Sequence, residues 1–142
     1  MENHVKKPVV YFASSHVPVN DLLRESAQTS DNEFILLLKN DKSILNRVLP
    51  AYLNSIVRQN DGIARAKTLR MEMLLFIAKT MRIETAIRVC GASGYKFMIV
   101  ASSTRVLTGF VKKTKIKLGK KCTLSLDYNE ASSVSYAGLP TE

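Results

Sequence analysis

Short apolar runs alternate along this chain with longer segments whose apolar residues recur every three or four positions. The runs have the length of β-strands, and three of them cover residues 8–13, 33–39 and 95–101. A last strand is expected over about 121–126. The continuous apolar run at 33–39 is too short for a typical helix, so we expect it to be a central strand.

The periodic segments predict helices between these strands. Helices are expected over 20–26, 46–58, 68–80, 82–90 and from a cap within 102–104 to about 113. The segment 68–80 is apolar nearly all round, so it should be the central buried helix. Strands and helices interleave without a regular βαβ period. This favours an α+β fold, a small mixed β-sheet of about four strands packed with several α-helices.

Particular residues fix the expected helix ends. Asn20 or Asp21 is expected to cap the first helix, with Leu22 and Leu23 facing inward. Asn46 should cap the second helix, which places Pro50 in the first turn, where its missing N–H has no intrahelical partner. The turn at 60–62 should end that helix. Gly91 should end helix 82–90, whose inward residues are expected to be Ile83, Ala86, Ile87 and Cys90.

Length and composition are those of an ordinary globular protein. The 142 residues suffice for one domain, which we expect to cover 1–142, and 46% of them are hydrophobic. A mainly disordered or low-complexity chain is therefore excluded. The tail at 127–142 is rich in Ser, Ala and Gly, and we expect it to be mobile unless a partner orders it.

The net charge of the chain indicates what kind of partner it binds. Lys and Arg number 21 against 12 Asp and Glu, which gives a net charge of +9. Residues 1–71 hold 10 basic and 7 acidic residues, whereas 72–142 hold 11 and 5. A polyanion such as a nucleic acid is therefore the favoured partner, and the C-terminal half is the more basic one.

Cysteine, histidine and apolar content indicate a cytoplasmic protein without a metal or cofactor. Cys90 and Cys122 stand among apolar residues, as core thiols of a reducing compartment do. His4 and His16 are twelve positions apart and have no ligand spacing around them. The longest apolar-rich run, 71–78, is too short to span a bilayer, and the N-terminus lacks the apolar region of a signal peptide.

No catalytic constellation is visible, so we expect the protein not to be an enzyme. Glu72 and Glu84 lie on different predicted helices, and neither has a histidine or a second acid nearby. Glu72 is the one acid in an apolar helix, and it is expected to pair with Arg65, Arg70 or another basic residue. Alternatively it organises an anion or partner site. A small transferase or hydrolase would need Glu72 and neighbouring arginines to line a deep pocket.

The glycines at 91 and 94 predict a helix cap and a turn. Their Gly-x-x-Gly spacing is also that of the RNA clamp in KH domains, which lies between two helices. The extended pattern that follows at 95–100 argues against a KH domain. A free-standing KH-like RNA-binding module stays open as an alternative.

Basic residues gather in two places. One group surrounds the 60–62 turn and continues to the far end of the next helix: Arg58, Arg65, Lys67, Arg70, Lys79 and Arg82. The other is 112–121, with six lysines in ten residues, which fits either a solvated strand face or phosphate contacts. Aromatic residues make up only 7% and Trp is absent, which favours RNA shape or an RNA end over base sequence as the target.

The stretch RAKTLRMEMLLF (65–76), followed by IETAI (83–87) and a glycine, resembles one protein family. The pattern A-x-(S/T)-L-x-x-E-x-L-L, then about a turn, then I-x-x-A-I is similar to that of the accessory subunits of the KEOPS (EKC) complex, the CGI/TPRKB (PRPK-binding protein) family. The resemblance is specific over about 47–101.

The resemblance implies an α+β domain without catalysis of its own. Such a subunit binds and regulates the small PRPK-like kinase/ATPase of KEOPS, contacts the other KEOPS subunits indirectly, and helps recruit tRNA by its 3′ CCA end for threonylcarbamoyl-adenosine modification. It implies tRNA-binding roles for Arg65, Lys67, Thr68, Lys79 and Arg82. It places kinase binding near the C-terminus, at Val134, Tyr136 and Leu139.

The chain departs from the family pattern between the two motif helices. Many relatives have Ser-Gly there, whereas this chain has Ala78-Lys79-Thr80. We therefore expect the sharp glycine turn between these helices to be lost, which changes the local RNA surface.

Overall fold

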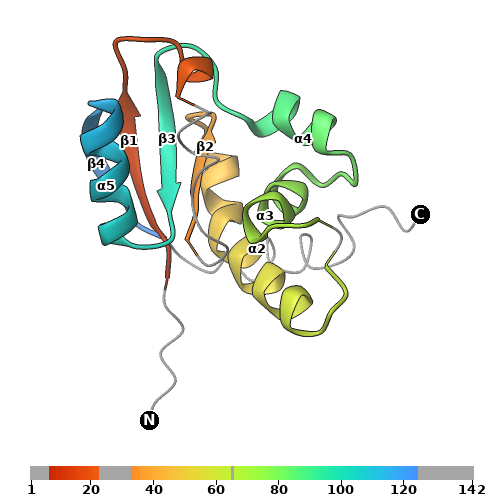
Figure 1. Cartoon of the computed structure of the whole chain (residues 1–142). Coiled ribbons are helices and arrows are strands. Elements are labelled where there is room, and N and C mark those ends of the chain that lie inside the picture. The colour runs from red at the N-terminus through yellow and green to blue at the C-terminus, as the bar shows by residue number, and fades with distance from the viewer. Residues whose placement is uncertain (1–6, 23–32, 65, 125–142) are drawn as a thin grey trace.

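The computed structural model describes residues 7–22, 33–64 and 66–124. These residues form one sheet of four strands in the order β2-β3-β1-β4 (Figure 1). The strands are β1 (Val9–Ser14), β2 (Ile35–Leu38), β3 (Lys96–Ala101) and β4 (Lys117–Cys122). This confirms the α+β class and the four-stranded sheet. Every pair of neighbouring strands is antiparallel. The expectation of a mixed sheet is therefore wrong.

The expected central position of β2 is wrong, because β2 lies at an edge of the sheet. All four of its residues are nevertheless buried. Leu36 and Leu38 belong to the core on one face, while Ile35 and Leu37 belong to the core on the other. A bridge between Leu38 and Gly91 covers part of its outer side. The continuous apolar run therefore indicates a strand that is buried on both faces. It does not indicate that the strand lies at the centre of the sheet.

Four α-helices and one 3₁₀ helix occur in the described residues. They are α2 (Lys42–Asn60), α3 (Leu69–Ala78), α4 (Ile83–Cys90), α5 (Thr104–Thr114) and η1 (Val19–Asp21). Figure 1 shows α5 on one side of the molecule, in front of β4, and α2, α3 and α4 on the other side. Of the expected helix at 20–26, the described residues show η1, after which Leu22 is buried as expected. Leu23 and the rest of that segment lie outside the described residues.

Helix α2 begins earlier than expected, so Asn46 is not its cap. The cap is Asp41, whose side chain accepts hydrogen bonds from the backbone N–H groups of Ser43 (2.8 Å) and Ile44 (3.3 Å). Pro50 therefore lies inside the helix and not in its first turn. Because proline has no N–H, it cannot donate to the carbonyl one turn back, and that helical hydrogen bond is missing.

Strand β4 was expected at 121–126 but runs from Lys117 to Cys122. Helix α5 is closed by Lys115, which adopts the left-handed conformation (φ 58°) and donates its N–H to the Val111 carbonyl (2.7 Å). The chain turns back at once, so that Lys117 lies opposite Ser14 of β1. The tight turn at the helix end, which the sequence pattern did not show, moves the strand forward.

The strands separate two cores. One core is formed with α2, α3 and α4, and six consecutive residues of α3, 72–77, are buried in or beside it. This confirms α3 as the central buried helix. The other core lies under α5, where Leu107 and Phe110 are buried. In α4, Ala86 and Cys90 are buried as expected, but Ile87 is 47% exposed, since only a narrow strip of this helix faces the core.

Candidate nucleic-acid interface

A buried ion pair organises the turn between α2 and α3. The Glu72 side chain is 1% exposed, and its Oε2 accepts a hydrogen bond from Nε of Arg58 at 2.9 Å. Its other oxygen, Oε1, accepts the backbone N–H of Ala66 at 2.9 Å. The expected pairing of Glu72 with a basic residue is confirmed. Both carboxylate oxygens serve the fold, which leaves Glu72 no surface for a substrate.

Arg58, in the last turn of α2, also contacts the loop that follows this helix. Its guanidinium lies over the Phe76 ring, 5.6 Å from the centroid, and its Nη2 donates to the Ile63 carbonyl at 3.3 Å. The Ile63 N–H in turn donates to the Arg58 carbonyl at 2.9 Å. Gly62, with φ of +72°, makes the bend that these bonds require. The loop is thus held at one end by the partly buried Arg58 and at the other by the buried Glu72.

The loop delivers Lys67 and Thr68 to the start of α3. Thr68 is the N-cap, and its Oγ1 accepts the Met71 N–H at 3.2 Å. Both Lys67 and Thr68 are exposed. A cation beside the amide-rich end of a helix makes the local potential positive, which favours an anion such as a phosphate. Arg65, the third residue implied here by the family resemblance, lies outside the described residues.

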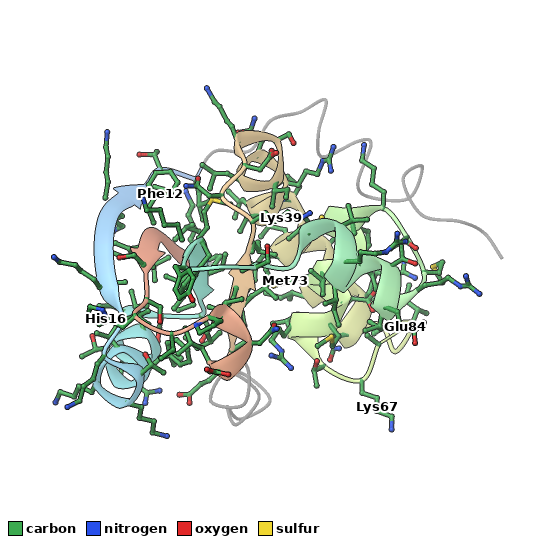
Figure 2. The ribbon with its side chains drawn as sticks, turned by 90° about the horizontal axis from the view of Figure 1, so that it is seen from above. Phe12, His16, Lys39, Lys67, Met73 and Glu84 are labelled. Atoms are coloured by element: carbon green, nitrogen blue, oxygen red, sulfur yellow. The ribbon has the colours of Figure 1, made fainter. Side chains whose placement is uncertain are left out.

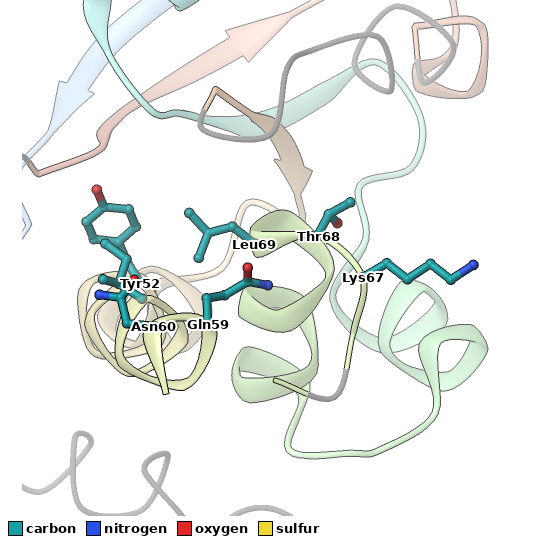
Figure 3. A pocket seen from close by; sticks show the side chains of 7 residues that line it. Tyr52, Gln59, Asn60, Lys67, Thr68 and Leu69 are labelled. Carbon is teal, nitrogen blue, oxygen red and sulfur yellow. The ribbon is translucent and has the colours of Figure 1, made fainter. Parts of the chain in front are cut away.

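A hollow of about 390 Å³ lies where the end of α2 meets the start of α3 (Figure 3). Its lining comes from both helices and the loop: Tyr52, Ile56, Gln59, Asn60, Lys67, Thr68 and Leu69. Figure 3 shows Lys67 extending away from Gln59 and Asn60, so its ammonium group marks the rim and not the floor. Sequence reasoning missed Tyr52, Gln59 and Asn60, because only the packing of α2 against α3 brings them to the turn.

Lys79 and Arg82 lie at the opposite end of α3. The helix has ten residues, so about 15 Å separates its two ends. Arg82 is exposed and is the N-cap residue of α4, and its N–H donates to Thr80 Oγ1 at 3.2 Å. The implied tRNA-binding residues therefore form two groups, Lys67 with Thr68 and Lys79 with Arg82, at the two ends of one buried helix.

The sharp turn after α3 is present, contrary to expectation. Lys79 itself adopts the left-handed conformation, with φ 57° and ψ 48°. Its N–H donates to the Phe76 carbonyl and the N–H of Thr80 to the Leu75 carbonyl, each at 3.2 Å, which is the bonding of a Schellman motif. A lysine thus makes the turn that glycine makes more easily.

The glycines at 91 and 94 connect α4 to β3, as a cap and turn would. A Cβ on Gly91 would approach the Ile87 carbonyl oxygen to 2.4 Å, so the close passage of the chain explains this glycine. Gly91 has φ of −67°, and its conformation is not the left-handed one expected of a helix-ending glycine. Because a strand follows, the segment lacks the second helix of a KH clamp.

The kinase-binding residues implied by the resemblance, Val134, Tyr136 and Leu139, lie outside the described residues. Within the described ranges, no group of three or more His, Cys, Asp or Glu side chains is placed to hold a metal ion. No helix among them has both the length and the apolar character of a membrane span. Cys90 and Cys122 are buried free thiols, as expected.

Comparison with models of known protein families gives no match, and comparison with curated protein sequences gives none either. The function is therefore inferred from the chain's own residues.

Proposed function

We propose that this chain is a non-enzymatic accessory subunit of a KEOPS-type complex. In this role it binds and regulates the small kinase/ATPase subunit and helps recruit tRNA by its 3′ CCA end for threonylcarbamoyl-adenosine modification in the cytoplasm. The observation that carries the proposal is the Arg58–Glu72 pair. The glutamate of the family-like motif is the residue that shapes the turn on which Lys67 and Thr68 are exposed.

The RNA part of the proposal is supported by position and charge. Lys67 and Thr68 stand beside a hollow of about 390 Å³ at the start of α3. The hollow offers the amide groups of Gln59 and Asn60 as hydrogen-bond partners and the half-buried side chain of Leu69 as an apolar contact. An RNA end presents phosphates, hydroxyls and base edges, which match this mixture of groups.

The kinase part is supported by apolar side chains that the helices leave in solvent. Ile87 and Val89 of α4 are 47% and 45% exposed. Val57 and Ile63, on either side of the α2–α3 turn, are 55% and 54% exposed. Exposed apolar side chains that form a contiguous patch are typical of protein-binding surfaces. The implied contacts of Val134, Tyr136 and Leu139 would add to them.

The test is a gel shift with intact tRNA and with the same tRNA lacking its 3′-terminal CCA, at two salt concentrations. We expect the shortened tRNA to bind much more weakly at both. Equal binding of the two would leave only sequence-independent phosphate attraction and would overturn the recognition of the CCA end.

A second measurement separates the adaptor from a free-standing RNA-binding module. A purified KEOPS kinase/ATPase subunit is expected to bind the chain, and Ile87→Asp with Val89→Asp is expected to abolish that binding. Val17→Asp, at a residue that is 40% exposed on the loop after β1, is the matched control. An RNA footprint on residues 112–121 together with no kinase binding would favour the free-standing module.

A further inference from the structure

The whole net charge of the protein comes from one segment. Residues 85–126 contain nine Lys and Arg and no Asp or Glu, whereas the remaining residues hold twelve of each sign. Six lysines of this segment, all exposed, form what we call the lysine surface: Lys112, Lys113, Lys115, Lys117, Lys120 and Lys121. The ion pairs found among the described residues, Arg58–Glu72 and Arg105–Glu33, do not involve these lysines.

The fold draws these lysines together at an edge of the sheet. Helix α5 carries Lys112 and Lys113 in its last turn, and the chain turns at Lys115 directly into β4, which is an edge strand. Figure 1 shows α5 in front of β4. The six lysines therefore stand on two elements that are consecutive in the chain and on the turn between them, and each positive charge raises the electrostatic energy of its near neighbours until an anion binds.

Strand register places a seventh cation, Lys96, near the start of β4. Ser14 of β1 lies opposite Lys117 on one side and opposite Lys96 on the other. The two lysines therefore flank Ser14 on the same face of the sheet, about 10 Å apart across two strand spacings. Next to this row is a hollow of about 460 Å³, lined by Ser14, Ser15, His16, Lys115, Ile116 and Lys117. Hydroxyls and ammonium groups are typical phosphate ligands.

The side chains of this surface favour a nucleic-acid backbone over other anionic partners. The large apolar residues exposed in the described part are Val17, Val57, Ile63, Ile87, Val89 and Tyr95, and none lies on α5 or β4. A membrane-binding surface would carry apolar side chains among its lysines. Protein interfaces are depleted in lysine and enriched in aromatic residues and arginine. Exposed lysines on elements that expose no large apolar side chain are suited to phosphates, which are bound without regard to sequence.

We propose that the lysine surface is a second RNA-contacting surface, which binds the phosphate backbone of a helical stretch of RNA. This inference rests on the proposed function in one respect, the choice of RNA as the nucleic acid. The lysine surface is distinct from the α2–α3 turn, since Figure 2 shows Lys67 on the opposite side of the molecule from His16, which lines the hollow beside Lys115 and Lys117. An RNA that reached both surfaces would be held by an end at one and by its body at the other.

The test uses the full chain and a blunt-ended RNA duplex, which has no CCA end. Binding is measured over a range of salt concentrations from about 50 to 200 mM. The variant is Lys117→Gln with Lys121→Gln. The matched control, Lys39→Gln with Lys42→Gln, removes the same charge from exposed lysines at the start of α2. A third variant, Lys117→Arg with Lys121→Arg, keeps the charge at the surface.

We expect the glutamine variant in β4 to bind the duplex about tenfold more weakly, with a salt slope lower by about two, roughly one for each phosphate that a lysine no longer neutralises. The control and the arginine variant should bind like the unmodified chain. Should Lys117→Gln with Lys121→Gln fail to fold, Lys112→Gln with Lys113→Gln on α5 replaces it.

Three results would overturn the inference. These are equal weakening by the β4 variant and the control, no weakening by either, or binding to phosphatidylserine vesicles with no binding to the duplex. The duplex carries no CCA end, so failure of the CCA test leaves this measurement unaffected. Conversely, loss of the lysine surface would leave the recognition of the CCA end in place.

Discussion

The guanidinium of Arg58 lies 2.9 Å from the carboxylate of Glu72 and joins the last turn of α2 to the first turn of α3. The pair is almost shielded from water, with 15% of the Arg58 side chain and 1% of the Glu72 side chain exposed. Such a pair contributes little against apolar replacements, yet removing one partner leaves a buried charge without compensation. Here it also holds the Ala66 N–H and with it the loop.

We therefore predict that Glu72→Ala lowers the free energy of unfolding by about 3–5 kcal/mol. Urea denaturation measures this change. The double variant Arg58→Met with Glu72→Met should lose less unfolding free energy than Glu72→Ala, because no unpaired charge remains buried. Glu84→Ala, at an exposed position of α4, is the control and should change the value by less than about 0.5 kcal/mol. A small loss on Glu72→Ala would show that the pair does not fix the turn.

Lys79→Gly should stabilise the protein by about 1 kcal/mol, since glycine adopts the left-handed conformation at the end of α3 without steric cost. Thermal or urea unfolding measures the gain. Lys112→Gly, within helix α5, should lower stability by about the same amount, because glycine weakens regular helix. Destabilisation by Lys79→Gly would mean that the lysine side chain makes a contact worth more than the backbone strain.

Arg65→Glu with Lys67→Glu should weaken tRNA binding by a few kcal/mol at low salt and leave the fold intact. The loss arises because two attractive charges at the α2–α3 turn become repulsive. A gel shift gives the affinity, and circular dichroism checks the fold. Lys39→Glu with Lys42→Glu changes the net charge equally at another exposed place. Unchanged tRNA binding by the first variant would place the RNA site elsewhere.

Burial raises the pKa of the Cys90 thiol, and likewise that of Cys122. Below the usual thiol pKa of about 8.5, both folded and unfolded thiols are protonated, and the stabilisation is complete. As pH rises, the unfolded thiols ionise first, so the free energy of unfolding falls until the folded thiols also ionise. Unfolding of the unmodified chain and of Cys90→Ala at about pH 8 to 10 should show a smaller fall in the variant. Equal falls would contradict the role of the thiol.

Elements with a strong local signal could be predicted from the sequence. The apolar run of β3 and the nearly all-apolar segment of α3 each need no distant partner to be recognised, and Ser103 before α5 is a capping residue in sequence and in structure. The misplaced features depend on where helices begin and end. Pro50 lies inside α2 because Asp41 caps the helix earlier, and β4 begins at Lys117 because Lys115 adopts a left-handed turn.

The site shows the same division. The position of Glu72 in an apolar helix predicts that it pairs with a basic residue. That this residue is Arg58 follows only from the way the loop returns to α2. The hollow beside Lys67 includes Tyr52 and Gln59, which stand on one helix several positions apart and carry no motif. Local patterns thus indicate which residues are unusual, and the tertiary fold decides what they contact.

The place of β1 in the sheet has a consequence during protein synthesis. Its residues, Val9–Ser14, pair only with β3 and β4 among the described strands, and β3 begins at Lys96. At a translation rate of about 5–20 residues per second, β1 is made roughly 4–17 s before its first partner. During that interval an apolar strand has both edges free, which is the state that invites association with other chains. The nascent chain therefore has to keep this segment apart from its neighbours on the ribosome until the second half arrives.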